Sequence, residues 1–160
     1  MIAKRRDRVV SMPRFETSQD FAFPPERVFD AFTRPAHLAQ VMPPELDFRV
    51  LEAPERLELG SRVTVQARRW GLGQRVTSAV TAFEAGVSFV QEQVAGPFRR
   101  WVHAHHFEVL PDGGTRVSEV IDFEPPGGLL GLQLTAAAVE RELARVFEHR
   151  MERWKELLGP

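Results

Sequence analysis

The chain has 160 residues, a formal net charge of −1 and no cysteine. Its length is typical of one domain that encloses both a hydrophobic core and an internal cavity. A charge this close to zero, without a strong basic stripe, argues against a nucleic-acid-binding protein, and the lack of cysteine excludes disulfides, thiolate catalysis and cysteine-ligated zinc.

The chain begins with a basic cluster at residues 4–8, KRRDR. We expect residues 1–13 to form a basic, flexible tail, with contact to phosphate or a membrane surface as the alternative interpretation. The apolar run after the cluster is too short for a signal peptide, and no segment reaches the apolar length of a membrane span. We therefore expect a single domain over residues 14–160 and a cytoplasmic location.

The first half of the chain predicts short elements separated by prolines. Residues 15–23 alternate weakly and stop at two prolines, which indicates a first strand. Residues 24–33 and 36–42 predict two short helices, because proline is favoured in the first turn of a helix. The first helix should bury Val28, Phe29 and Phe32. Four more strands are predicted, at residues 46–51, 62–70, 73–83 and 87–94.

A strand predicted at residues 99–110 carries aromatic and imidazole side chains on one face. Side chains two residues apart share a face of a strand. The row expected to point inward is Arg99, Trp101, His103, His105, Phe107 and Val109. Two imidazoles among apolar rings need partners or a ligand, because an unpaired buried polar group costs roughly 1–3 kcal/mol. The row therefore predicts the floor of a pocket.

A turn at residues 111–114, PDGG, joins this strand to another predicted at residues 115–124. In the resulting hairpin Glu119 shares the inward face of His105. Two registers fit the turn, one with Glu119 opposite Phe107 and one with Glu119 opposite His105. Either register brings the carboxylate of Glu119 close to the imidazole of His105.

The last 26 residues predict one long amphipathic helix at residues 135–158, which Gly159 and Pro160 end. Its apolar stripe consists of Val139, Leu143, Val146, Phe147, Met151, Trp154 and Leu158. A curved antiparallel sheet of about seven strands can pack around such a helix. We therefore predict an α+β fold in which the helix lies across the concave face of the sheet and leaves a cavity.

Several motifs resemble the ligand-binding branch of the SRPBCC, or START-like, superfamily over about residues 15–158. They are FVQEQVAGPF at residues 89–98, the W-x-H-x-H-x-F spacing of residues 101–107, Gly114-Thr115, PPGGLLG at residues 125–131 and Phe147-x-x-Arg150. The resemblance implies the helix-grip fold and a cavity for lipids, sterols, polyketides or aromatic compounds. It also implies that some relatives are cyclases, aromatases or hydroxylase components. Glu119 stands where relatives tend to carry Asp, and Phe123 replaces a common Tyr, which removes one polar anchor.

His103, His105 and Glu119 fit more than one chemistry. The His-x-His spacing is that of some metal sites, but a closed site needs four ligands and the resemblance implies none, so we expect no metal and no other cofactor. The pair of His105 and Glu119 suits acid–base work, because a carboxylate fixes the imidazole tautomer and raises its pKa. The remaining interpretations are a polar patch that orients a ligand and a structural hydrogen bond. No serine has the context of a nucleophile, and the glycines do not match a nucleotide loop.

These patterns predict a helix-grip protein that encloses a small, mostly apolar ligand. The expected ligand-binding residues are Trp101 and Phe107 as stacking surfaces, His103, His105 and Glu119 as polar partners, and Phe123. One alternative is an enzyme of cyclase, dehydratase or isomerase type that uses His105 or Glu119 for proton transfer. Another is an accessory module that binds a protein partner through the pocket or the exposed helix face.

Overall fold

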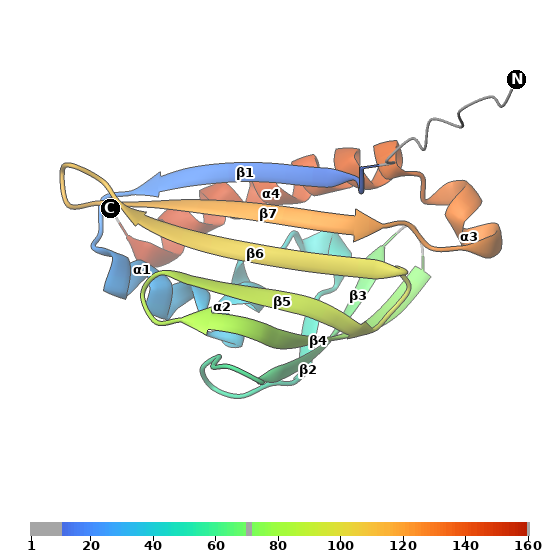
Figure 1. Ribbon diagram of the computed structural model, residues 1–160, viewed down its shortest axis with the longest axis horizontal. Helices are drawn as coiled ribbons and strands as arrows, with labels where there is room; N and C mark the ends of the chain where they lie inside the picture. Colours follow the sequence, from blue (N-terminus) through green and yellow to red (C-terminus); the bar gives the residue numbers. More distant parts are fainter. Residues whose placement is uncertain (1–10, 70–71, 160) are drawn as a thin grey trace, which may run out of the picture.

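The computed structural model describes residues 11–69 and 72–159, and within them seven strands form one antiparallel sheet in the order β1-β7-β6-β5-β4-β3-β2 (Figure 1). The strands are β1 (Arg14–Phe21), β2 (Arg49–Glu52), β3 (Arg62–Arg69), β4 (Leu72–Glu84), β5 (Ser88–Ala95), β6 (Arg100–Val109) and β7 (Thr115–Glu124). The predicted α+β fold is confirmed. Most of the predicted basic tail, and Trp70 at the end of the predicted strand 62–70, lie outside the described residues.

The helices lie on one side of the sheet, with α4 running behind β1 and β7 (Figure 1). They are α1 (Pro25–Phe32), α2 (Pro35–Val41), the 3₁₀ turn η1 (Pro44–Leu46), α3 (Gly128–Gln133) and α4 (Ala136–Leu158). The two short helices after β1 and the long C-terminal helix were all predicted, and Val28, Phe29 and Phe32 of α1 are buried as expected. Among the described residues, no helix is both long and apolar enough to cross a membrane.

Local sequence explains where α4 begins and ends. The Thr135 hydroxyl accepts a hydrogen bond from the backbone N–H of Ala138 at 3.2 Å, which satisfies one of the free N–H groups at the helix start. Gly159, with φ of 90°, ends the helix. The buried stripe differs from the prediction at one turn, because Arg150 is buried and Met151 is only partly buried. Hydrophobic spacing misses this arginine, since its burial depends on an ionic partner across the core.

Three local predictions were wrong. Leu46 was predicted to begin a strand but ends the 3₁₀ turn η1, and β2 begins only at Arg49, because the consecutive prolines before Leu46 fix φ and remove the N–H groups that a sheet needs. Arg99 and Val109 were expected to point into the pocket, but Arg99 precedes β6 with a side chain that is 61% exposed, and Val109 lies at the end of β6 and is 63% exposed. Helix α3 was not predicted, and its Leu129 and Leu132 are 85% and 76% exposed, so no apolar pattern could identify it as a packed element.

The interior contains two clusters of buried apolar side chains. One gathers around Phe29, Phe89, Phe107 and Trp154, and the other around Phe98, Ile121, Phe123 and Phe147. Along each of β6, β7 and α4, the inward-facing positions between the two clusters are occupied by polar residues: His103 and His105, Glu119, and Arg150. The fold therefore holds a polar layer between two hydrophobic cores.

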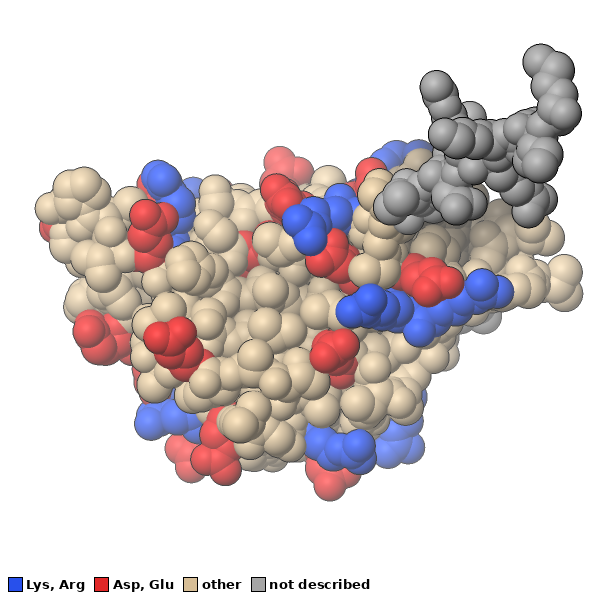
Figure 2. Space-filling model, in the orientation of Figure 1, with Lys and Arg blue, Asp and Glu red and all other residues tan. Residues whose placement is uncertain are grey.

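The opposite face of the sheet is charged in both signs. Figure 2 shows acidic and basic side chains interspersed over the visible face. Two pairs bridge directly opposed residues of β1 and β7: Arg14 to Asp122 at 2.7 Å and Arg116 to Asp20 at 2.8 Å. Opposite charges at these positions favour the observed register, although exposed pairs contribute only modest stability.

Candidate functional site

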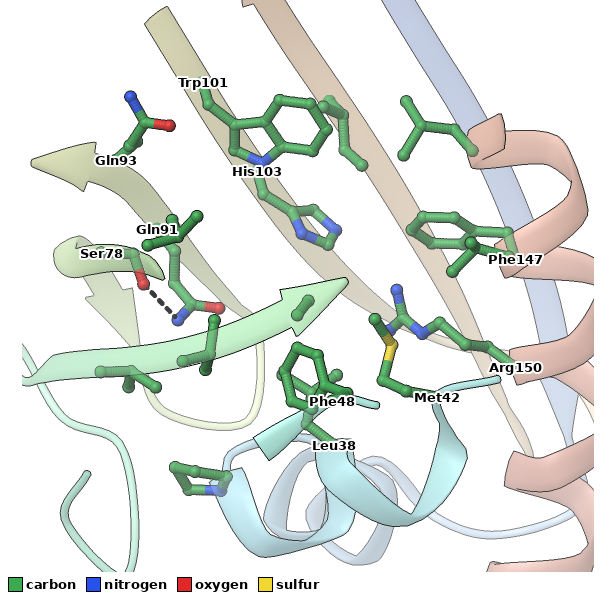
Figure 3. A pocket seen from close by; sticks show the side chains of 18 of the residues that line it. Leu38, Met42, Phe48, Ser78, Gln91, Gln93, Trp101, His103, Phe147 and Arg150 are labelled. Carbon is green, nitrogen blue, oxygen red and sulfur yellow. Dashed lines mark hydrogen bonds between the residues drawn. The ribbon is translucent and has the colours of Figure 1, made fainter. Parts of the chain in front are cut away.

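A cavity of about 180 Å³ lies between the inward face of the sheet, α2 and α4 (Figure 3). Apolar side chains form most of its wall, among them Leu38, Met42, Phe48, Trp101 and Phe147. They come from α2 and its C-terminal end, the segment before β2, strand β6, and α4. The long helix packs behind β1 and β7 at one end of the sheet (Figure 1), while side chains from β3, β4 and β5 toward the other end complete the cavity wall.

One side of the cavity carries neutral polar side chains from β4 and β5. The Gln91 amide Nε2 donates to the Ser78 hydroxyl at 3.4 Å (Figure 3), and the Gln93 amide Nε2 donates to the backbone oxygen of Phe98 at 2.7 Å. Gln91 lies directly opposite His103 in the β5–β6 register. A band of amides therefore borders the imidazole of His103 on the cavity wall.

The buried carboxylate of Glu119 organises the polar layer. Its Oε2 atom accepts a hydrogen bond from His103 Nε2 at 2.8 Å and one from Arg150 Nη2 at 3.3 Å, and it lies 3.2 Å from His105 Nε2. The β6–β7 register pairs His105 with Glu119, which is the second of the two predicted registers. The predicted proximity of Glu119 and His105 is therefore confirmed.

Burial and charge set the protonation of this layer. Burial by itself raises the pKa of Glu119, but the Arg150 charge and the hydrogen bonds from His103 and His105 outweigh it and hold the pKa well below the usual value. Burial lowers the pKa of His103 to about 4, with the neighbouring His105 adding to the decrease. Near neutral pH, Glu119 is thus a carboxylate paired with Arg150, and His103 is a neutral imidazole.

The neighbours of the two histidines determine what each can do. Because the Nε2 atom of His103 faces a carboxylate, it carries the hydrogen, and the Nδ1 atom of the neutral ring keeps a free lone pair. His105 is stacked between Phe89, at 4.1 Å between ring centroids, and His103, at 4.0 Å. The Nδ1 atom of His105 is buried without a partner among the described residues. His103 is therefore the histidine better placed to meet a ligand.

The same three residues offer a ligand set for a metal ion, since one atom from each of His103, His105 and Glu119 lies within 4.8 Å of the others. The geometry fits a metal poorly. Both Nε2 atoms face the same Glu119 oxygen, at 2.8 and 3.2 Å, so the carboxylate occupies the position on which the two imidazoles converge. The Arg150 cation on the same carboxylate oxygen would also repel a metal ion.

Of the six residues expected at the site, three line the cavity and three do not. Trp101, His103 and His105 line the cavity, whereas Glu119 lies behind the histidines. Phe107 is covered by Phe29 and Phe32 of α1, at 5.0 and 5.5 Å between ring centroids. Phe123 is fully buried beneath Phe98 and Trp101. Both phenylalanines face inward as predicted but belong to the two cores and not to the cavity wall.

Other residues of the cavity wall were not predicted from the sequence. Gln91 and Gln93 were noticed only as part of a motif, although polar side chains two apart on an inward strand face are a signal of a polar wall. Arg150 was also noticed only through the motif with Phe147. Its role depends on contacts between α4 and β7, and these are distant in sequence.

Comparisons with known proteins agree with this architecture. The sequence profile of a family described as polyketide cyclase / dehydrase and lipid transport matches residues 12–158. No curated protein sequence matches the chain. Similar solved structures include protein CV1439 from Chromobacterium violaceum, with 17% identity, a TM-score of 0.70 and coverage of 92% of this chain and 98% of that one.

Two further solved structures have the same fold. A START superfamily protein from Mycobacterium smegmatis has 13% identity, a TM-score of 0.70 and coverage of 91% of this chain and 96% of that one. Protein TTHA0849 from Thermus thermophilus has 19% identity, a TM-score of 0.63 and coverage of 88% and 96%. At these identities the likeness shows the fold alone, and it confirms the predicted helix-grip arrangement.

Proposed function

This chain belongs to the polyketide cyclase / dehydrase and lipid transport family, and from that premise we propose that it binds a small, mostly apolar organic molecule between the sheet and α4. The observation that carries the proposal is the cavity of about 180 Å³ with apolar walls and a bordering band of polar groups. Ligand sites typically combine an apolar lining with a few placed polar groups. An apolar engineered cavity of about 150 Å³ in another protein holds benzene, so this volume suits one ring with a short substituent.

The charges of the polar layer favour binding over proton transfer. A general base works best when its pKa is near the working pH. The pKa of His103, about 4, makes this imidazole a weak base at neutral pH. Arg150 has a part in this, because it neutralises the carboxylate that would otherwise stabilise a protonated His103.

A proton-transfer enzyme is the second candidate, and one observation favours it. The hydrogen bond from His103 Nε2 to Glu119 fixes the imidazole tautomer and leaves Nδ1 free to act on a ligand in the cavity. In this version of the hypothesis His103 replaces His105 as the reacting group, because His105 is enclosed by stacked rings. Turnover that is lost in His103→Gln but kept in His106→Gln, on the exposed side of β6, would support it.

Native mass spectrometry of the purified protein tests the binding proposal. We expect a retained small molecule that organic solvent releases, and less retention in Trp101→Ala, which removes part of the cavity wall. Val102→Ala on the opposite face of the same strand is the control. A protein that retains nothing and shows no ligand-dependent change in tryptophan emission with apolar probes would contradict the proposal. A copurifying protein in place of a small molecule would favour the accessory-module interpretation.

A further inference from the structure

The free polar atoms on the cavity wall include a hydrogen-bond acceptor at His103. The hydrogen on Nε2 points to Glu119 Oε2 at 2.8 Å, so the lone pair of Nδ1 remains available. The imidazole projects from β6 between Trp101 and Arg150 (Figure 3). None of the hydrogen bonds among the described residues uses the Nδ1 atom of His103. A ligand that leaves this acceptor unpaired would remove it from water without compensation.

Gln91 adds a second acceptor beside the first. Its amide hydrogens face the Ser78 hydroxyl at 3.4 Å, which leaves the Oε1 atom toward the cavity (Figure 3). Directly opposed side chains of neighbouring antiparallel strands have Cβ atoms about 4.5–5.5 Å apart. Gln91 and His103 are such a pair, so one polar edge of a ligand can reach both.

The charge of the layer limits the charge of the ligand. The Glu119 carboxylate and the Arg150 guanidinium pair at 3.3 Å, and each side chain is less than one tenth exposed. A ligand carboxylate would add a third, uncompensated charge to this buried pair. The Nε–H group of Arg150 has no partner among the described residues, and an uncharged oxygen is enough to accept its hydrogen bond.

We propose that the cavity selects an uncharged ring compound that bears a hydroxyl group, and that this hydroxyl donates a hydrogen bond to Nδ1 of His103, with Gln91 Oε1 as the neighbouring acceptor. This inference rests on the proposed binding function and names the chemical class of its ligand. The ring lies among the apolar walls, and the hydroxyl faces β5 and β6. Phenols and hydroxylated alicyclic compounds belong to this class, whereas fatty acids do not.

Four probes of similar size separate the contributions: para-ethylphenol, para-ethylanisole, ethylbenzene and para-ethylbenzoate. The anisole keeps the oxygen of the phenol but cannot donate, and the benzoate carries a charge. Dissociation constants are measured by heteronuclear NMR titration near neutral pH. We expect the phenol to bind roughly 3- to 10-fold more tightly than the anisole or ethylbenzene, which is the range of one neutral hydrogen bond, and the benzoate to bind most weakly.

Variants of the wall assign the preference to its residues. His103→Phe should lose most of the preference for phenol over anisole, since only the Gln91 acceptor remains, whereas His106→Phe, on the exposed side of β6, should keep the difference. Gln91→Leu leaves the polar layer intact and should reduce the preference, so it serves if His103→Phe does not fold. Equal affinity of the wild-type protein for phenol and anisole, or tightest binding of the benzoate, overturns this inference and leaves the binding function standing. Failure of all four probes to bind overturns both.

Discussion

At the scale of single residues, Arg150 determines how the buried carboxylate acts on its neighbours. A carboxylate beside an imidazole normally stabilises the protonated ring. Here burial is the main reason that His103 stays neutral, and Arg150, which contacts the same Glu119 oxygen atom, adds to the lowering of the His103 pKa. Arg150 on α4 therefore weakens the effect of the Glu119 charge on the neighbouring imidazole.

Replacing Arg150 with methionine should raise the pKa of His103. Burial is the largest cause of the low value, about 4, but the Arg150 charge also lowers it, and without that charge Glu119 attracts a proton to the imidazole. Imidazole proton shifts followed through a pH titration measure the change, with Arg141→Met on the exposed side of α4 as the control. An unchanged His103 titration in Arg150→Met would show that the arginine does not tune this histidine.

Acid should destabilise the fold through the protonation of His103. The folded-state pKa of His103 is about 4, below the ordinary value of 6.5, so the unfolded chain binds the extra proton between these two values. Stability from this group is complete above pH 6.5 and is lost as pH falls toward 4, by roughly 3 kcal/mol. Glu119 acts in the same direction at lower pH, because its depressed pKa contributes stability that protonation removes.

Urea unfolding at a series of pH values measures this dependence. The free energy of unfolding should decrease less between pH 6.5 and 4 in His103→Gln than in the wild-type protein. His106→Gln, exposed on the outer face of β6, should follow the wild-type curve. Parallel curves for all three proteins would mean that His103 titrates normally in the folded state.

At the scale of elements, alternation and helical spacing predicted which face of each strand or helix is buried, but they did not predict which other element packs against that face. The burial of Val117, Glu119, Ile121 and Phe123 on β7 follows the expected alternation. Periodicity could not show that Phe107 lies beneath α1, because that contact joins residues about eighty positions apart in sequence. Nor could it place Arg150 inside, because only the carboxylate on β7 makes the burial of this charge favourable.

The packing of α4 and of α3 predicts opposite responses to truncation of their side chains. Trp154 of α4 is 2% exposed and stacks on Phe32 at 4.1 Å between ring centroids. Trp154→Ala should therefore lower the free energy of unfolding by about 3–5 kcal/mol. Leu132→Ala in α3 removes an exposed side chain and should change it by less than about 0.5 kcal/mol. Chemical denaturation compares the two, and a small effect at Trp154 would contradict its place in the core.

At the scale of the whole molecule, the cavity and the polar layer belong to one arrangement. Two apolar cores hold the ends of α4 against the sheet, and the ion pair of Arg150 with Glu119 holds its middle. Side chains of β3, β4 and β5 complete the cavity wall on the side away from α4. Sequence patterns predicted the helix over the sheet and the two histidines in the cavity wall, His103 and His105. They could not predict the opposite wall from α2 and β4, because it depends on how far the sheet curves.

Filling the cavity should separate ligand binding from folding. Val76 lies on the cavity wall in β4, and Val76→Phe places a larger apolar side chain in the space that a ligand would occupy. A ligand that binds only the folded state raises stability by mass action, so para-ethylphenol should raise the melting temperature of the wild-type protein. That increase should disappear in Val76→Phe and persist in Arg75→Phe, whose side chain is exposed on the other face of β4.

Differential scanning fluorimetry with increasing phenol concentration makes the comparison. An equal increase in both variants would place the ligand outside the cavity, and no increase in the wild-type protein would contradict binding itself.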